Sequence, residues 1–162
     1  MGALHEGEVT MGSRSRFVVA SLVAVLTGVG GASAADKPED AAQAAAESWL
    51  KVVDAGDYPA SWSQAAAALK AAVKQAEWGQ VAAGIRTPLG KVVSRKLKSR
   101  EYTENGPTTR VIGGRVYSWS GRGKCVIIQY ETSFANKASA IETVIPVPDS
   151  DGAWRVSAYS VR

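Results

Sequence analysis

Two glutamates, Glu131 and Glu142, lie on neighbouring predicted strands near the end of this 162-residue chain. A pair of carboxylates that faces one cavity can act as general acid and general base, provided that one stays protonated and the other ionised. Positions on solvent-exposed strand faces explain the two residues equally simply. We therefore assign no catalytic residue and keep a carboxylate-based enzyme as an alternative.

A ligand pocket in this chain would need a few polar groups among its apolar walls. Strand parity gives Arg95, Tyr130 and Tyr159 as candidate ligand-binding residues, with the guanidinium of Arg95 available to bind a carboxylate. Tryptophans could line the same pocket, but each lies on an apolar stripe, which favours core packing. The tryptophans concerned are Trp49, Trp62, Trp78 and Trp154.

A basic stretch, residues 91–102, is predicted to be an extended strand. Alternate residues of a strand share a face about 6.6 Å apart, so Lys96, Lys98 and Arg100 are expected to form a row suited to a polyanion or an anionic surface. The candidate anion-binding residues are Lys91, Lys96, Lys98 and Arg100. Lysines on an edge strand also discourage pairing with other sheets, and this solubilising role is the simpler explanation.

The first 34 residues have the pattern of a secretory signal peptide. The cationic start, the apolar run and the small residues before the cleavage site are, in order, Arg14 and Arg16, Phe17 to about Val29, and Ala32-Ser33-Ala34. The apolar run is shorter than the roughly 20 residues of a membrane-spanning helix. We expect translation from Met11, cleavage near Ala34/Ala35, and a periplasmic or secreted single domain over residues 35–162 without a transmembrane segment.

Removal of this leader would also remove His5, the one histidine of the sequence. A domain without imidazole cannot form a Ser-His-Asp triad, a Cys-His pair or a histidine-based zinc site. Cys125 is the single cysteine, so no internal disulfide can form, and its apolar neighbours indicate a packed position in a strand. We expect neither a metal nor a cofactor.

Positive charge is concentrated in one segment of the chain. The whole sequence carries a formal net charge of +4, whereas residues 86–124 contain ten lysines and arginines against two glutamates. A cationic segment attracts anionic partners. In an envelope compartment the candidate partners are a small ligand or an anionic envelope component, and nucleic acid is not expected.

Helical and strand periodicities divide the domain into two halves. Apolar residues at three- and four-residue spacing predict three helices, over residues 36–55, 57–73 and 77–85. Beyond Gly90, β-branched residues predict four strands, over residues 91–102, 125–134, 140–147 and 154–161. Helices followed by closely connected strands indicate an α+β domain, with three N-terminal helices packed on a four-stranded antiparallel sheet.

Alternation within the later strands predicts which side chains share a face. On the strand 125–134, the expected face is Val126, Ile128, Tyr130, Thr132 and Phe134. On the strand 140–147, it is Ile141, Thr143, Ile145 and Val147. The turn sequence Asp149-Ser150-Asp151-Gly152 predicts an antiparallel hairpin between the last two strands.

Residues 104–123 form a stretch rich in glycine and arginine between the predicted strands. A structureless loop of this length is unusual inside a compact domain. We favour a mobile functional loop, and the alternative is an added hairpin arm with residues 115–119 as one strand. Tyr117 and Trp119 could add stacking or interfacial anchoring there.

Several segments together carry a family resemblance. They are Ala46–Leu50, Asp54–Tyr58, Trp62, Trp78, Arg86–Gly90, Ser94–Lys98, Val126–Phe134, Asn136-Lys137, Glu142–Val144 and Gly152–Ser157. With them the chain resembles the bacterial domain-of-unknown-function family 4019 over most of residues 42–162. The resemblance implies a nuclear-transport-factor-2-like or cystatin-like cone, in which helices pack into a curved sheet that can enclose a pocket. It implies no activity.

These observations favour a small exported protein that is a non-catalytic binding or interaction module of the cell envelope. One alternative is a small enzyme that uses carboxylate and Tyr or Arg groups in a cone-shaped pocket. Another is a binder of anionic envelope surfaces through the basic strand. A pocket in which Glu131 or Glu142 converges with Arg95 would favour the enzyme, whereas a filled interior with an exposed basic face would favour the module.

Overall fold

The computed structural model describes the backbone of residues 37–106, 109–112, 115–118 and 123–162, and the side chains of residues 37–106 and 123–162. The predicted signal peptide over residues 1–34 and the predicted start at Met11 lie outside this part of the chain. The same holds for the side chains of Tyr117 and Trp119.

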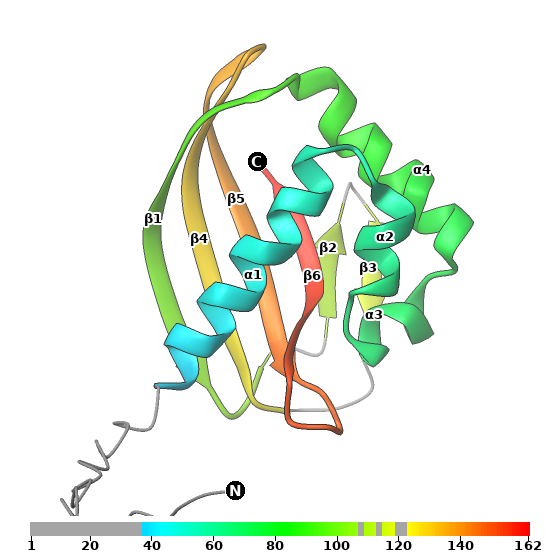
Figure 1. Cartoon of the computed structure of the whole chain (residues 1–162), viewed down its shortest axis with the longest axis vertical. Helices are drawn as coiled ribbons and strands as arrows, with labels where there is room; N and C mark the ends of the chain where they lie inside the picture. Colours follow the sequence, from blue (N-terminus) through cyan, green and yellow to red (C-terminus); the bar gives the residue numbers. More distant parts are fainter. Residues whose placement is uncertain (1–36, 107–108, 113–114, 119–122) are drawn as a thin grey trace, which may run out of the picture. The chain divides into compact units, whose positions relative to one another are not determined.

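Helices come first along the described chain and strands follow (Figure 1). The helices are α1 (Pro38–Asp54), α2 (Tyr58–Ser63), α3 (Ala67–Ala72) and α4 (Gln75–Arg86), followed by the 3-10 turn η1 (Thr87–Leu89). The strands are β1 (Val92–Thr103), β2 (Thr109–Ile112), β3 (Arg115–Ser118), β4 (Cys125–Phe134), β5 (Lys137–Pro148) and β6 (Trp154–Val161). None of these helices has the length and apolar character needed to cross a membrane.

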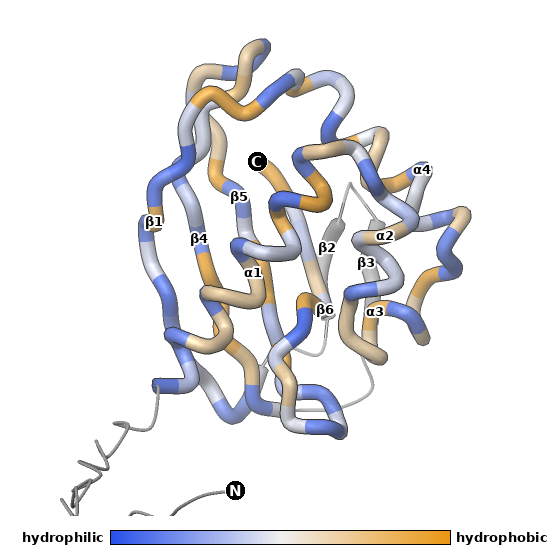
Figure 2. Tube along the Cα trace, viewed as in Figure 1, coloured by the Kyte–Doolittle hydropathy of each residue, from blue (hydrophilic) through white to orange (hydrophobic). Residues whose placement is uncertain are grey.

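Four of the strands form an antiparallel sheet in the order β1-β4-β5-β6. Helix α1 packs across one face of this sheet (Figure 1). Figure 2 shows that β1 is hydrophilic over much of its length, whereas β4 and β5 contain hydrophobic stretches. The predicted α+β class and the antiparallel pairing of the last two strands are confirmed.

The number of helices differs from the prediction, because the expected helix over residues 57–73 is divided into α2 and α3. Asp57 begins α2 as predicted and accepts a hydrogen bond from the backbone N–H of Ala60 at 3.0 Å. The division occurs where the N–H of Ala66 donates to the carbonyl of Val156 on β6 at 2.9 Å. This bond to the sheet replaces a bond within the helix, so a tertiary contact overrides the helical preference of an alanine-rich segment.

An aromatic core lies between the helices and the sheet. The rings of Trp49 and Trp78 lie 5.9 Å apart, and the ring of Tyr159 lies 5.5 Å from that of Trp49. Both indole N–H groups donate to Ser61, Trp49 to its carbonyl at 2.7 Å and Trp78 to its hydroxyl at 2.9 Å. Because buried indoles need such partners, the predicted core packing of Trp49 and Trp78 is confirmed.

The inward face of the sheet follows the alternation along β4. All five residues of its predicted face are buried: Val126, Ile128, Tyr130, Thr132 and Phe134. Their cross-strand partners on β5 include Ala140, Glu142 and Val144, so these residues face the helices as well. The residues of β5 that are predicted to share a face, starting at Ile141, lie on the opposite side of the sheet from Glu142, because alternate residues of a strand point to opposite faces.

Strand β1 contains two β-bulges. Its register with β4 shifts between Val92 and Ser94, and again between Leu97 and Ser99. Each bulge adds one residue to β1 and interrupts the alternation of side chains between the two faces. Bulges of this kind also make an edge strand a poorer template for pairing with another chain.

The bulge near Lys98 separates the cations of β1 onto two faces. Arg100 pairs with the buried Ile128 and therefore points toward the helices, whereas Lys96 pairs with the exposed Glu131 and points to the outer face. The predicted single row of Lys96, Lys98 and Arg100 is wrong for this reason. Lys96 and Lys98 remain together on the outer face, near Glu131.

Within the predicted loop 104–123 the structure contains a two-stranded hairpin. Strands β2 and β3 pair antiparallel, with Thr109 opposite Ser118 and Ile112 opposite Arg115. The N–H of Gly106 donates to the carbonyl of Gly123 at 2.9 Å, which brings the two ends of the segment together. Over residues 109–112 and 115–118 the backbone therefore follows the alternative, a hairpin arm, and not the favoured mobile loop.

Candidate functional site

Six polar side chains from six elements meet between the helices and the sheet. We call this group the buried ion cluster, and its members are Asp54 (α1), Arg86 (α4), Arg95 (β1), Thr132 (β4), Glu142 (β5) and Tyr159 (β6). The cluster contains two cations and two carboxylates. It is the densest polar network among the described residues inside the fold.

Two chain reversals bring the helical members to the cluster. Asp54 is the last residue of α1, and Gly56 follows it with a φ of 78°, which ends the helix. Arg86 is the last residue of α4, and η1 with Gly90 then turns the chain into β1, where Arg95 lies. Both α1 and α4 therefore end with a charged residue that is directed at the sheet.

Glu142 is the centre of the cluster and its side chain is 0 % exposed. Its Oε2 accepts hydrogen bonds from Arg95 Nε and from the hydroxyl of Thr132, each at 2.6 Å. Its Oε1 accepts from the hydroxyl of Tyr159 at 2.7 Å, from Arg86 Nη1 at 3.1 Å and from Arg95 Nη2 at 3.2 Å. Both oxygens are thus fully occupied by donors of the same chain.

Asp54 completes the network at its more exposed end. Arg95 donates to both of its oxygens, at 2.7 and 3.0 Å, in the two-bond geometry that guanidinium and carboxylate favour. Arg86 Nη2 lies 2.9 Å from Asp54 Oδ1, and the guanidinium of Arg86 also stacks 4.8 Å from the centre of the Phe134 ring. Each arginine therefore bridges both carboxylates.

The pKa values of Arg86, Arg95 and Tyr159 keep these three groups in one charge state near neutral pH. Burial lowers the pKa of Arg95, but its hydrogen bonds to Asp54 and Glu142 outweigh this and raise the pKa above the ordinary arginine value. Burial also lowers the pKa of Arg86, but its interactions with Tyr159, Asp54 and Glu142 outweigh this and raise the pKa. Burial is also the main reason why the pKa of Tyr159 is raised, and the charge of Glu142 adds to it. The phenol is therefore neutral and donates to Glu142.

This arrangement is suited to holding elements together and poorly suited to acid–base chemistry. A catalytic carboxylate must exchange a proton with a substrate at hydrogen-bond distance. Glu142 has no exposed surface and five donors around it. A buried network with balanced charge, in which Arg86 Nε is the one buried side-chain atom without a hydrogen-bond partner among the described residues, instead fixes the relative positions of the elements that it connects.

The structure brings two of the three predicted ligand-binding residues together. Arg95 and Tyr159 both contact Glu142, at 2.6 and 2.7 Å. Tyr130 is the cross-strand neighbour of Glu142 and is buried, but its hydroxyl has no hydrogen-bond partner among the described residues. Burial raises the pKa of Tyr130, and the negative charge of Glu47 on α1 raises it further. Tyr130 thus borders the cluster without joining its network.

Three members of the site were not predicted from the sequence: Asp54, Arg86 and Thr132. The first two occupy helix ends, where a charge is ordinarily solvated or interacts with the helix dipole. The available signal was Glu142, a charged residue in the same strand parity as Ala140 and Val144. All four charged members also lie within segments that carry the family resemblance.

Glu131 and Glu142 do not form a catalytic pair. Glu131 pairs with Ile141 and Glu142 with Tyr130, so the two carboxylates lie on opposite faces of the sheet. The side chain of Glu131 is 61 % exposed and its carboxylate lies 2.9 Å from the ammonium of Lys98. Their convergence on one cavity is therefore excluded by geometry.

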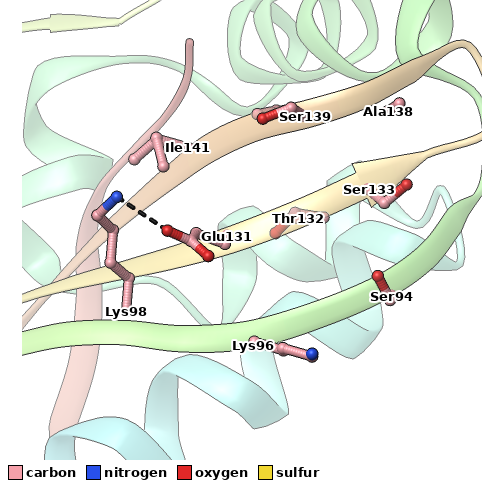
Figure 3. Close-up of a pocket in the computed structure, with 10 residues that line it drawn as sticks. Ser94, Lys96, Lys98, Glu131, Thr132, Ser133, Ala138, Ser139 and Ile141 are labelled. Atoms are coloured by element: carbon pink, nitrogen blue, oxygen red, sulfur yellow. Dashed lines mark hydrogen bonds and ion pairs between the residues drawn. The ribbon is translucent and has the colours of Figure 1, made fainter.

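A groove lies on the outer face of the sheet, over β1, β4 and β5 (Figure 3). We call it the outer groove, and seven polar residues line it: Ser94, Lys96, Lys98, Glu131, Ser133 and Ser139, together with the buried Thr132. Its volume is about 310 Å³. The groove contains Lys96 and Lys98 from the predicted anion-binding set, so it is the candidate binding surface of the described chain.

The other two predicted anion-binding residues lie elsewhere. Arg100 forms an ion pair with Asp40 on α1 and donates to the side chain of Gln43 at 3.0 Å. Lys91 is exposed in the turn before β1, where its carbonyl accepts from the N–H of Ala135 at 2.8 Å. Neither residue lines the outer groove.

Comparison with known proteins identifies a family but no characterised relative. A family model described as "Protein of unknown function (DUF4019)" matches residues 45–159. No curated protein and no solved structure gave a significant match. Among the described residues, no group of three or more His, Cys, Asp or Glu side chains is placed to hold a metal ion.

Proposed function

Since the chain belongs to the DUF4019 family of proteins of unknown function, we propose a function from the geometry of its two polar sites. The protein is a non-catalytic binding module that is exported to the cell envelope. Its binding surface is the outer groove, and its ligand is an anionic component of the envelope. The buried ion cluster is the structural centre of the fold.

The main support for this proposal is that the charged groups inside the fold are paired with one another. Glu142 is wholly buried and accepts five hydrogen bonds, while Arg86 and Arg95 each contact both carboxylates. No charge is left in the cluster for a ligand. Recognition by charge must therefore occur at the surface.

The outer groove offers unbalanced charge at the surface. Two lysines line the groove, but only one carboxylate does, that of Glu131. The ammonium of Lys98 lies 2.9 Å from this carboxylate. Lys96 forms no ion pair with any described residue, so its ammonium is available to an anion. Export would place this surface where anionic lipids and polysaccharides are abundant, and the pattern of residues 1–34 supports export.

The enzyme alternative is supported by one observation, the contact of Arg95 with Glu142 at 2.6 Å. A reaction at this position would require the carboxylate to leave at least one internal donor and reach a substrate. The carboxylate of Glu142 has no exposed surface, which argues against such a reaction. We therefore favour the binding module.

Retention on anionic material tests the proposal. The purified protein is applied at low salt to vesicles that contain phosphatidylglycerol and to an immobilised acidic polysaccharide. The double variant Lys96→Glu, Lys98→Glu is compared with a control, Lys37→Glu, Lys74→Glu, that has the same net charge. The control lysines precede α1 and α4, where a carboxylate is compatible with the helix dipole.

The proposal expects the wild type and the control to be retained on at least one of the two materials, and the groove variant to be released. It also expects retention to weaken as salt is raised. Equal loss in both variants would show that net charge matters and the groove does not. Undiminished retention of the groove variant would refute the proposal.

A further inference from the structure

The geometry points to a saccharide that bears carboxylate groups as the ligand of the outer groove. This inference rests on the proposed binding function and narrows it to one chemical class. It depends on the hydroxyl groups of the groove, on its limited positive charge and on its shape. Each of these features separates a sugar from a membrane surface.

Three serines form the floor of the groove across three adjacent strands. Ser94 on β1 pairs directly with Ser133 on β4, and Ser139 lies on β5 beside them (Figure 3). Serine hydroxyls both donate and accept hydrogen bonds, which matches the hydroxyl groups of a sugar. A row of small hydroxylated residues also leaves the groove open enough for a ring to lie against the sheet.

The charged residues of the groove are arranged for one carboxylate next to hydroxyl groups. Figure 3 shows the ammonium of Lys98 reaching Glu131, whereas the side chain of Lys96 extends along the free edge of β1 and makes no such contact. Lys96 can therefore bind a carboxylate of a ligand that reaches the β1 edge of the groove. Glu131 can accept hydrogen bonds from sugar hydroxyls, and its negative charge disfavours a ligand with dense charge at the same point.

A membrane surface is a poorer match to this groove. Cations near a membrane contribute about 1 kcal/mol each to binding an anionic bilayer. The groove has two cationic residues, Lys96 and Lys98, so this contribution is small. No aromatic residue lines it, and Ile141 is its one large apolar residue. A groove with a volume of about 310 Å³ also matches a discrete ligand better than it matches a flat bilayer.

Calorimetric titration of the full protein tests the inference. The probes are a tetramer of galacturonate, its methyl ester, which has the same length without charge, and vesicles of phosphatidylglycerol with phosphatidylethanolamine. The variants are Lys96→Gln and the double variant Ser94→Ala, Ser139→Ala. Ser48→Ala with Ser63→Ala is the serine control, because both residues are exposed on helices.

We expect the galacturonate tetramer to bind and its methyl ester to bind much more weakly. Lys96→Gln should weaken tetramer binding about fivefold, the upper range for an exposed ion pair. Loss of two serine hydroxyls should weaken it about tenfold, and the serine control should not change it.

The possible failures are distinguishable. If vesicles bind in a manner that depends on Lys96 while the tetramer does not bind, the saccharide inference is wrong and the proposed function stands. If the methyl ester binds as tightly as the acid, the role of the carboxylate is refuted. If neither the tetramer nor the vesicles bind, both this inference and the choice of the groove as a binding surface fail.

Discussion

Arg95 and Glu142 share two hydrogen bonds, from Nε to Oε2 at 2.6 Å and from Nη2 to Oε1 at 3.2 Å. The same guanidinium holds Asp54 through two further bonds. One side chain of the edge strand β1 thereby connects β5, two positions away in the sheet, with the end of α1. This relationship gives the interior charges of β1 and β5 their partners.

Replacing Glu142 with glutamine should strongly destabilise the fold. The amide leaves two buried arginines with Asp54 as their only carboxylate and directs N–H groups at their donors. Removal of one partner from a buried ion pair costs about 3–5 kcal/mol. Glu131→Gln on the outer face is the matched control, with an expected cost of about 1 kcal/mol or less. Urea unfolding at pH 7 measures both, and equal costs would contradict the role assigned to the cluster.

Stability should fall as the pH rises above about 10, the ordinary pKa of tyrosine. Burial raises the pKa of Tyr159 and of Tyr130 in the folded protein, so the unfolded chain releases these protons first. Each such tyrosine lowers the unfolding free energy by up to about 1.4 kcal/mol per pH unit. Tyr159→Phe should remove the contribution of one tyrosine to the slope of unfolding free energy against pH, as measured by urea unfolding between pH 9 and about 11.5. An unchanged slope would show that Tyr159 ionises equally in both states.

Ser61→Ala should destabilise the aromatic core by about 1–3 kcal/mol, the cost of a buried donor without a partner. The substitution removes the acceptor of the Trp78 indole N–H, whereas the bond from Trp49 to the backbone of residue 61 stays. Ser63→Ala, at an exposed position of the same helix, is the control and should cost less than about 0.5 kcal/mol. Thermal and urea unfolding followed by tryptophan fluorescence would detect the difference, and equal stability of the two variants would contradict it.

Gly90→Ala should destabilise the turn that connects the two arginines of the cluster. Gly90 has φ 75° and ψ −162°, and an added Cβ would lie 3.2 Å from the Cβ of Ala135 and from the side chain of Asn136. Such a conformation costs about 1–3 kcal/mol for other residues.

A second glycine provides the control for this prediction. Gly79 lies inside α4, and a Cβ there would meet no atom within 4 Å. Gly79→Ala should therefore stabilise the protein by about 0.5–1 kcal/mol. Thermal unfolding of the two variants should give shifts of opposite sign, and a stabilising effect of Gly90→Ala would refute the assignment of strain to this turn.

Local sequence signals predicted the elements of this fold where the determining residues are neighbours. Asp57 at the start of α2, Gly56 after α1 and the alternation along β4 all act within a few residues. The division of the second helix could not be predicted in this way. It depends on a backbone bond from Ala66 to Val156, which lie 90 residues apart.

The candidate sites show the same limit. The bulge near Lys98 results from pairing with β4, and no residue type in β1 marks it. Glu142 stands out in the sequence as a charged residue whose neighbours of the same strand parity are apolar. Its partner Arg86, however, lies 56 residues away. A sequence pattern can therefore indicate that a buried charge needs partners without identifying which residues supply them.

We propose that the interior charges hold the fold together and that the outer groove binds the ligand. The most direct test compares the retention of Glu142→Gln and of Lys96→Glu, Lys98→Glu on anionic vesicles and acidic polysaccharide, below the unfolding temperature of each variant. We predict that the folded Glu142→Gln variant is retained as well as the wild type and that the groove variant is not retained. Loss of retention by folded Glu142→Gln, or full retention of the groove variant, would contradict the claim.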